Sequence, residues 1–293
     1  MTVIRPLPVR VPLVQAETLD SYLSRLAASN HLNPRDLCAY LGMRTRTRPP
    51  DLDRLAIMTG HPPHRLSSVL ADACPPSGRN RLTPLPGRVA CRQCTARRGI
   101  SGDVYCVNAD QRLCCRHRRW LGGLSEDSTH QHNITSLPDV VRAQRRHYRL
   151  VRRHGTHRGR DAIYWAGTII DRWSEGGDWD EHRCRRLAVH CTATASSREP
   201  DAGLSPMVNY PEIVTLASLI ADDDWRAIAS ADHRRDRVSF DREVARRLGL
   251  ACTGFDSGDP LVSWQEAEAV VRRQRLHEQP GYRGPEVWLS TSA

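Results

Sequence analysis

Four residues near the middle of the chain have the types and the spacing of a metal site. Cys91 and Cys94 form a C-x2-C pair, and Cys114 and His117 form a C-x2-H pair after nineteen intervening residues. Two such pairs let four side chains converge on one ion from two tight turns, which is the spacing of a structural zinc site. Because four protein ligands leave no open coordination position, we expect Zn²⁺ to hold structure rather than to catalyse.

Neighbouring thiols and imidazoles leave alternatives to this ligand set. Cys115 stands beside Cys114 and could replace it at a shorter spacing to the histidine, and Cys106 is a further thiol between the two pairs. His130 and His132 could bind a second metal ion, although an exposed polar loop is the other interpretation of that segment. Scattered buried thiols would be a third explanation, but isolated core cysteines have no reason to pair twice at this spacing.

The ends and the hydropathy of the chain indicate its compartment. The sequence begins Met1-Thr2-Val3-Ile4-Arg5 without a continuous apolar leader, and it has no apolar run long enough to span a membrane. We therefore expect a cytoplasmic protein with no membrane partner. Thiolates persist in that reducing compartment, which favours metal binding over disulfide formation.

Arginine dominates the charge of the chain. The 293 residues include 43 Lys and Arg against 33 Asp and Glu, a formal net charge of +10, and every one of those 43 bases is Arg. Codon use in a GC-rich genome explains the absence of lysine. The physical consequence holds regardless, because the planar guanidinium fork fits phosphates and guanine edges. The composition therefore favours a polyanionic partner such as DNA.

The absence of lysine also limits the chemistry. Such a chain has no Walker A motif, no lysine Schiff base and no lysine general base. The run Asp222-Asp223-Asp224 could suggest a metal-dependent nuclease, but three carboxylates before Trp225 more often cap a helix. We therefore expect a protein that is not an enzyme, and we assign any ATP hydrolysis in its pathway to a partner.

Two Arg-rich segments are candidates for phosphate contact, with a solvated charged surface as the alternative for both. Residues 44–50 read as a basic loop, and residues 137–154 read as a basic helix in a stretch without acids from Val140 to Arg160. The candidate nucleic-acid-binding residues in these segments are Arg44, Arg46 and Arg48 in the loop and Arg145, Arg146, Arg149, Arg152 and Arg153 in the helix.

Apolar spacing predicts an extended, Pro-rich arm over residues 1–16, which could lie against a partner, and helices that then follow in two pairs. The predicted helices of these pairs cover residues 18–30, 33–41, 52–59 and 62–70. Ala56, Gly60 and Leu66 have the A-x3-G-x5-L spacing of a helix-turn-helix.

The same offsets recur upstream at Ala27, His31 and Leu37, with histidine in place of the turn glycine. If the second pair docks on DNA, its last helix would present His64 and Arg65 outward for base contact. Any αα-hairpin with a glycine turn would produce the same spacing without binding DNA.

Composition divides the chain into three parts, and the predicted fold class is mainly α. We expect a helix-turn-helix-like N-terminal domain over residues 1–85, a small zinc ribbon over 86–135 and a helical C-terminal domain over 136–293. The ribbon would contain short strands near residues 104–107 and 112–113. The C-terminal domain would contain a mobile linker near residues 191–206. Its expected helices cover residues 162–173, 211–219, 224–230, 242–248 and 263–275.

These motifs together resemble the TniQ family over about the first 150 residues. The resemblance rests on Glu17-Thr18-Leu19-x-Ser21-x-Leu23-x-Arg25-Leu26-Ala27-x-x-Asn30, on Leu55-Ala56-x-x-Thr59-Gly60 with Leu66, and on the two metal-site pairs. Pro211-Glu212 followed by Leu216-Ala217-x-Leu219 resembles a later family segment. The chain departs from the family pattern at Ala16, where glycine is usual, and it lacks a further cysteine pair that many members have after the histidine.

The resemblance implies a target-selection factor of Tn7-like and related transposons, here of an actinobacterial type. Members of the family contact DNA, or a nucleic-acid-guided complex, and recruit an AAA+ ATPase that delivers the transposase. The implied function is that of a non-enzymatic, zinc-containing DNA-binding adaptor. The alternative is a free-standing transcriptional regulator that binds DNA through the same helices without a transposition partner.

Overall fold

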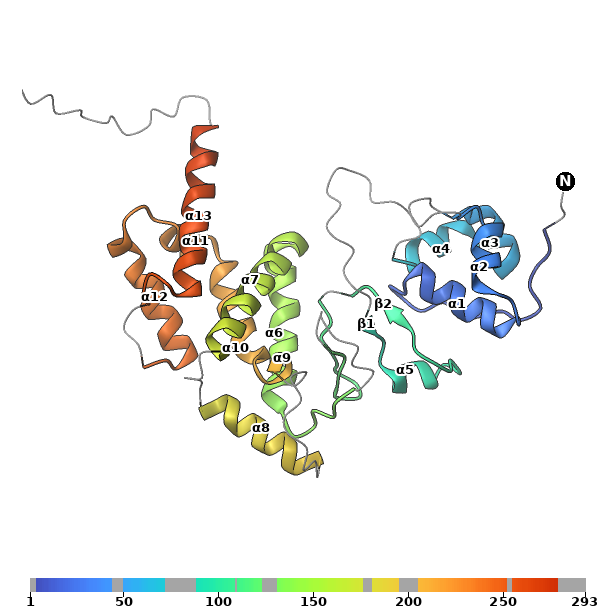
Figure 1. Cartoon of the computed structure of the whole chain (residues 1–293), viewed down its shortest axis with the longest axis horizontal. Helices are drawn as coiled ribbons and strands as arrows, with labels where there is room; N and C mark the ends of the chain where they lie inside the picture. The colour runs from blue at the N-terminus through green and yellow to red at the C-terminus, as the bar shows by residue number, and fades with distance from the viewer. Residues whose placement is uncertain are drawn as a thin grey trace, which may run out of the picture. The chain divides into compact units, whose positions relative to one another are not determined.

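The computed structural model describes residues 4–43, 50–71, 88–108, 110–122, 131–175, 181–194, 205–251 and 255–278. These residues form two compact units, Met1–Ser136 and Leu137–Ala293. The described elements are mainly helical and the strands are short, as the sequence predicts (Figure 1). The boundary predicted near residue 85 falls outside the described residues.

Unit 1 contains two pairs of helices around one apolar core. The pairs are α1 (Leu19–Ser29) with α2 (Pro34–Tyr40), and α3 (Leu52–Thr59) with α4 (Pro63–Val69). Side chains of Thr18, Asn33 and Asp51 accept hydrogen bonds from the first turns of α1, α2 and α3, which explains where these helices start. The core they share includes Tyr22, Leu23, Leu26, Leu37, Leu41, Leu55 and Leu66, all buried.

Both turns between paired helices contain a residue in the left-handed conformation. Gly60 ends α3 with φ +71°, and its N–H donates to the Ala56 carbonyl over 2.8 Å. A Cβ at this position would lie 3.1 Å from Cζ of Arg10, so glycine also leaves room for that guanidinium. His31 has φ +56° in the turn after α1, which matches the glycine position of the helix-turn-helix spacing.

The N-terminal arm is extended, as its prolines predict, and it packs on the helices of its own unit. The Leu7 N–H donates to the Met58 carbonyl over 2.9 Å, and Val9 exchanges two hydrogen bonds of 2.9 Å with the Asn30 side chain. Val11 is buried in the helical core. Part of the apolar surface of the arm is therefore buried within unit 1, while Val9 is exposed.

Two small antiparallel ladders and one short helix follow the helical pairs. Strand β1 (Arg88–Val89) pairs with β2 (Tyr105–Cys106), and β3 (Leu113–Cys114) pairs with β4 (Arg119–Trp120). Helix α5 (Arg92–Ala96) lies between β1 and β2 in the sequence. Strands β2 and β3 overlap the two strands that the sequence predicts.

A backbone junction joins the helical pairs to this β segment. The Thr18 N–H donates to the Tyr105 carbonyl, and the Val107 N–H donates to the Ala16 carbonyl, each over 2.8 Å. The Tyr105 N–H donates to Oγ of Ser21, which lies in the first turn of α1. The helices and the β segment therefore belong to one unit.

The junction surrounds an internal ion pair that the sequence does not predict. The Glu17 carboxylate is 0% exposed and accepts hydrogen bonds from Ser21 Oγ at 2.9 Å and from Arg25 at 2.8 and 2.6 Å. Helical spacing predicts Arg25 on the polar side of α1, but its side chain is only 11% exposed. Arg25 turns inward because a buried carboxylate requires a charged partner.

Unit 2 is built around a nearly fully buried helix, α10 (Tyr210–Ile220). Helices α6 (Pro138–His154) and α7 (Thr156–Glu175) both contact α10, and α12 (Arg234–Leu248) contacts it as well. Gly159 allows α7 to approach α6, since a Cβ there would lie 3.0 Å from the Val151 backbone. Helices α11 (Asp223–Ala229) and α13 (Pro260–His277) complete this bundle.

The sequence does not predict two helices of unit 2, α8 (Glu181–Thr194) and the short α9 (Ser205–Val208). The linker expected near residues 191–206 thus starts within α8 and ends within α9, and residues 195–204 lie outside the described part of the chain. Arg186 fixes α8 by donating two hydrogen bonds to Glu212 at 2.7 and 2.6 Å and a further one to Asp139. These partners are distant in sequence, so local spacing gives no sign of them.

Candidate metal centre

Two structural turns bring the four predicted ligands together. Cys91 caps α5 and Cys94 lies within it, and the Cys94 N–H donates to the Cys91 carbonyl over 2.9 Å. Cys114 ends β3, and His117 lies in the turn between β3 and β4, where Arg118 takes φ +47°. The second pair therefore sits in a β-hairpin, as in a zinc ribbon, whereas the first pair opens a helix.

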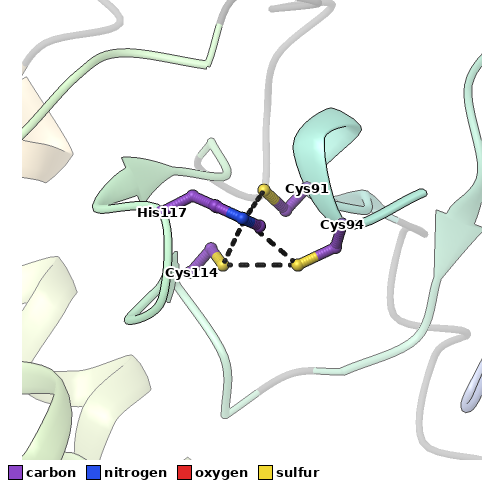
Figure 2. A group of neighbouring side chains, drawn as sticks. All are labelled: Cys91, Cys94, Cys114 and His117. Atoms are coloured by element: carbon purple, nitrogen blue, oxygen red, sulfur yellow. Dashed lines mark hydrogen bonds between the residues drawn. The ribbon is translucent and has the colours of Figure 1, made fainter. Parts of the chain in front are cut away.

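The ligand atoms form a compact cluster, shown in Figure 2, in which all four lie within 4.8 Å of one another. Nδ1 of His117 lies 3.4 Å from Sγ of Cys91, 3.3 Å from Sγ of Cys94 and 3.7 Å from Sγ of Cys114. The sulfurs of Cys94 and Cys114 are 3.7 Å apart.

These separations fit a tetrahedral zinc ion. Sulfur and nitrogen ligands at about 2.3 and 2.0–2.1 Å from Zn²⁺ give sulfur–sulfur separations of about 3.8 Å and sulfur–nitrogen separations of about 3.6 Å. The donor set of three thiols and one imidazole is also among those that structural zinc uses. The residues therefore fit the metal in both chemistry and geometry.

The protonation of the ligands matters, because zinc binds thiolates and neutral imidazole. Burial raises the pKa of Cys91 and, together with the neighbouring Cys114 thiol, raises the pKa of Cys94 to about 12. Desolvation and the charges of Arg97, Arg116 and Arg119 lower the pKa of His117, which keeps the imidazole neutral. The imidazole is thus ready to bind a cation, while Cys91 and Cys94 must lose protons to do so.

The side chain of Gln131, which lies in the predicted polar loop, supports the first pair of predicted ligands. Nε2 of Gln131 donates to the Ala90 carbonyl at 2.8 Å, and Oε1 of Gln131 accepts from the Arg92 N–H at 3.0 Å. These bonds hold the backbone on both sides of Cys91. Position 131 lies about forty residues from its partners, and no sequence pattern in this chain connects them.

The alternative ligands lie elsewhere. Cys115 is exposed and Cys106 lies in β2, and neither belongs to the cluster. The backbone carbonyl of His132 accepts from the Trp120 N–H at 2.9 Å, which gives this residue a structural role beside β4. His130 lies outside the described residues. Among the described residues, the cluster of Cys91, Cys94, Cys114 and His117 is the one group of three or more potential metal ligands.

The predicted nucleic-acid-binding residues fall in three places. Arg44, Arg46 and Arg48 lie outside the described residues. His64 and Arg65 are exposed on α4, as the helix-turn-helix pattern predicts. The five predicted residues of α6 are also exposed: Arg145, Arg146, Arg149, Arg152 and Arg153. Their role in DNA binding stays a prediction.

The fold and the cluster together define a class of protein: paired short helices joined to a metal-ligand site of three cysteines and one histidine. Residues 8–121 match the TniQ family model, and this range includes both helical pairs and all four predicted ligands. Residues 8–121 therefore form a TniQ domain. No curated protein and no solved structure gave a match.

The match ends at Leu121, so the resemblance of residues 211–219 to a later family segment and the actinobacterial type both stay predictions. In the part of the chain that the structure describes, no helix has the length and apolar character needed to cross a bilayer.

Proposed function

We propose that this protein is a DNA-binding adaptor of a transposition system, in which a structural zinc ion stabilises the TniQ domain. The observation that supports this most directly is the family match over residues 8–121. The proposal extends it to target-site selection and to recruitment of an AAA+ ATPase, alone or with a nucleic-acid-guided complex. Zn²⁺ would be held by Cys91, Cys94, Cys114 and His117, whose spacing fits it.

In this proposal, zinc supplies a cross-link between two parts of the chain. The ligands lie on α5 and on the β3–β4 hairpin, two segments that are separated in the sequence by β2. Binding of the metal would therefore contribute directly to the free energy of folding. The metal would have no catalytic role, because all four coordination positions are filled by the protein.

The exposed residues of α4 support DNA contact by unit 1. His64 and Arg65 project from the second helix of a helix-turn-helix pair, which is the helix that enters the major groove in proteins of that type. Arginine reads guanine through two hydrogen bonds, whereas phosphate contacts position a protein without reading sequence. We assign base contact to these two residues and phosphate contact to the Arg-rich segments.

The adaptor would act without chemistry of its own. The sequence contains no lysine, so ATP binding by a Walker A motif belongs to the partner ATPase. We expect the purified chain to show neither ATP turnover nor metal-dependent nicking of DNA. Either activity in the clean, isolated protein would contradict the adaptor role.

The deciding experiment is a pull-down of the zinc-loaded chain with duplex DNA and with the AAA+ ATPase encoded nearest to its gene. An adaptor should retain both partners and should bring the ATPase onto DNA that the ATPase alone does not hold. If the chain binds a specific DNA site and never retains an ATPase, it is a free-standing regulator. If it binds no duplex DNA even at low salt, the DNA-binding part of the proposal is wrong.

A further inference from the structure

Unit 2 contains a basic groove that no sequence motif identifies. Three helices form it, α6, α10 and α12, and its volume is about 480 Å³. The lining residues are Arg146, Leu150, Val214, Thr215, Ser218, Arg246 and Arg247. Three of these seven residues are arginines and none is acidic. The groove thus collects positive charge from segments that are up to about one hundred residues apart in the sequence.

Hydroxyl groups of α10 hold two of the three guanidinium groups. Nη1 of Arg146 lies 3.4 Å from Oγ1 of Thr215, and Nη1 of Arg247 lies 3.5 Å from Oγ of Ser218. Both hydroxyls donate their own protons to backbone carbonyls of α10, at 2.8 and 2.7 Å. They therefore act as acceptors toward the arginines. An arginine held in this way loses less conformational entropy when it binds a ligand.

One carboxylate orients the two arginines of α12. Glu243 accepts from Arg246 at 2.8 and 2.7 Å and from Arg247 at 2.6 Å. These hydrogen bonds lower the pKa of Glu243 to about 2, so the carboxylate stays ionised at working pH. Three guanidinium groups and one carboxylate leave two net positive charges at the groove. Arg246 remains exposed, with donors free to reach a ligand.

The groove continues into a row of arginines along α6. Arg142, Arg146, Arg149 and Arg153 follow one another at helical spacings of four, three and four residues, so they lie on one side of the helix, and all four are exposed. The row spans about 16 Å, and one strand of a duplex passes about five phosphates in that length. Such a row suits an extended polyanion better than a single small anion.

The row ends at an acidic boundary. Arg153 pairs with Asp222 at 3.7 Å, and Asp223 pairs with Arg158 of α7. The aspartates that start α11 thus offset the positive charge at this end. At the groove, Glu243 offsets one of the three positive charges, and two remain.

We propose that the groove between α6, α10 and α12 binds the phosphodiester backbone of duplex DNA through Arg146, Arg246 and Arg247. This inference rests on the proposed DNA-binding function and locates a second, sequence-independent contact in unit 2. Arginine forks match phosphate oxygens in two-point hydrogen bonds, and held guanidinium groups add affinity without reading bases. The α6 row then guides the neighbouring phosphates of the same strand.

The test measures the affinity of the full-length, zinc-loaded chain for a labelled duplex by fluorescence anisotropy across a salt series. The groove variant is R246A/R247A, and R146A is a second variant on another helix. The matched control is R185A/R273A, which also removes two exposed arginines of unit 2 and also leaves their acids, Glu181 and Asp232, unpaired. All three variants change exposed side chains, and thermal unfolding checks that each one folds.

The expected result is a loss confined to the groove variants. Each lost phosphate contact should flatten the slope of log K against log salt by about 0.9 and should lower the affinity at 0.1 M salt by about eightfold. R246A/R247A should therefore flatten the slope by about two units, and R146A by about one. The losses should be the same for unrelated duplex sequences. R246K/R247K, which keeps the charge, should restore most of the slope.

Two outcomes would overturn the assignment in different ways. If the wild-type chain binds duplex DNA with a steep salt dependence and R246A/R247A behaves like R185A/R273A, the groove is not the site, although the proposed function stands. If R246A/R247A loses binding to poly-L-glutamate but not to duplex DNA, the groove takes an acidic protein segment instead. Absence of duplex binding by the wild-type chain would reject the DNA-binding proposal as well.

Discussion

Replacing Ala16 with glycine should stabilise the protein. Ala16 has φ +60°, in the left-handed region that L-residues with a Cβ rarely adopt. Its backbone cannot relax, because its N–H donates to the Val69 carbonyl and its carbonyl accepts from the Val107 N–H, each over 2.8 Å. The conformation is thus imposed by partners on both sides. The TniQ pattern that this chain resembles usually has glycine at this position, which now has a physical explanation.

The size of the effect follows from two opposing contributions. The left-handed conformation costs an alanine about 1–2 kcal/mol that glycine does not lose. Glycine in turn gives the unfolded chain more freedom, which removes about 0.4–1 kcal/mol of that gain. The net increase in the free energy of unfolding should be about 0.5–1 kcal/mol, which corresponds to an increase in Tm of roughly 1–4 °C for a unit of this size.

Urea unfolding of the zinc-loaded chain, followed by circular dichroism, measures this change for A16G against the wild type. The matched control is A28G, because Ala28 is exposed within α1 and has ordinary helical geometry. A28G should lower the free energy of unfolding by about 0.5–1 kcal/mol. The two substitutions are chemically identical and should have opposite signs. If A16G is as destabilising as A28G, the reasoning about backbone strain is wrong.

Three further predictions concern the metal cluster and the junction beside it. C94A should abolish the binding of one zinc ion per chain and should unfold the β segment. C115A should leave the zinc content unchanged, because Cys115 is exposed and lies outside the cluster. Elemental analysis of both variants measures the zinc content. The pKa of Cys91 is raised and that of Cys94 is raised to about 12, so both thiols hold protons at pH 7. Zinc binding should therefore release at least two protons per ion, and the apparent affinity for zinc should increase with pH. Calorimetry in buffers of different ionisation enthalpy counts these protons, and a release of fewer than two would contradict zinc binding by the cluster. R25M should lower the free energy of unfolding by about 3–5 kcal/mol, because it leaves the buried Glu17 carboxylate without its charged partner. E17Q/R25M should lower it by less, because the unpaired charge is removed as well. A double variant as unstable as R25M would show that the unpaired charge is not the cause.

Local patterns were sufficient to predict the four residues of the cluster and most of the helices. The spacing of the cysteine and histidine pairs is enough to identify them. The helix caps at Thr18 and Asn33 also depend only on residues within a few positions of each other. Gly60 is also predictable, because few other residues tolerate the left-handed turn. Strand positions near the second ligand pair followed from short apolar segments.

Contacts between residues that are distant in the sequence could not be predicted. Gln131 reaches the backbone beside Cys91, and Arg186 ties α8 to α6 and α10, but each is an ordinary polar residue in its local context. Helical spacing alone predicts Arg25 at the surface, and its contact with the buried Glu17 carboxylate is seen only in the folded structure. The groove on unit 2 combines side chains from three helices, so its charge is visible only when those helices are packed.

The junction between residues 16–18 and 105–107 also determines when the chain can finish folding during synthesis. The Tyr105 N–H that meets Ser21 is 84 residues further along the sequence, so closing this contact requires a long loop to be ordered. A nascent chain that ends near residue 85 has made all four helices of the paired bundle, yet it lacks the strand that covers Glu17. Its early helices therefore reach their final packing only after the segment that follows them has left the ribosome.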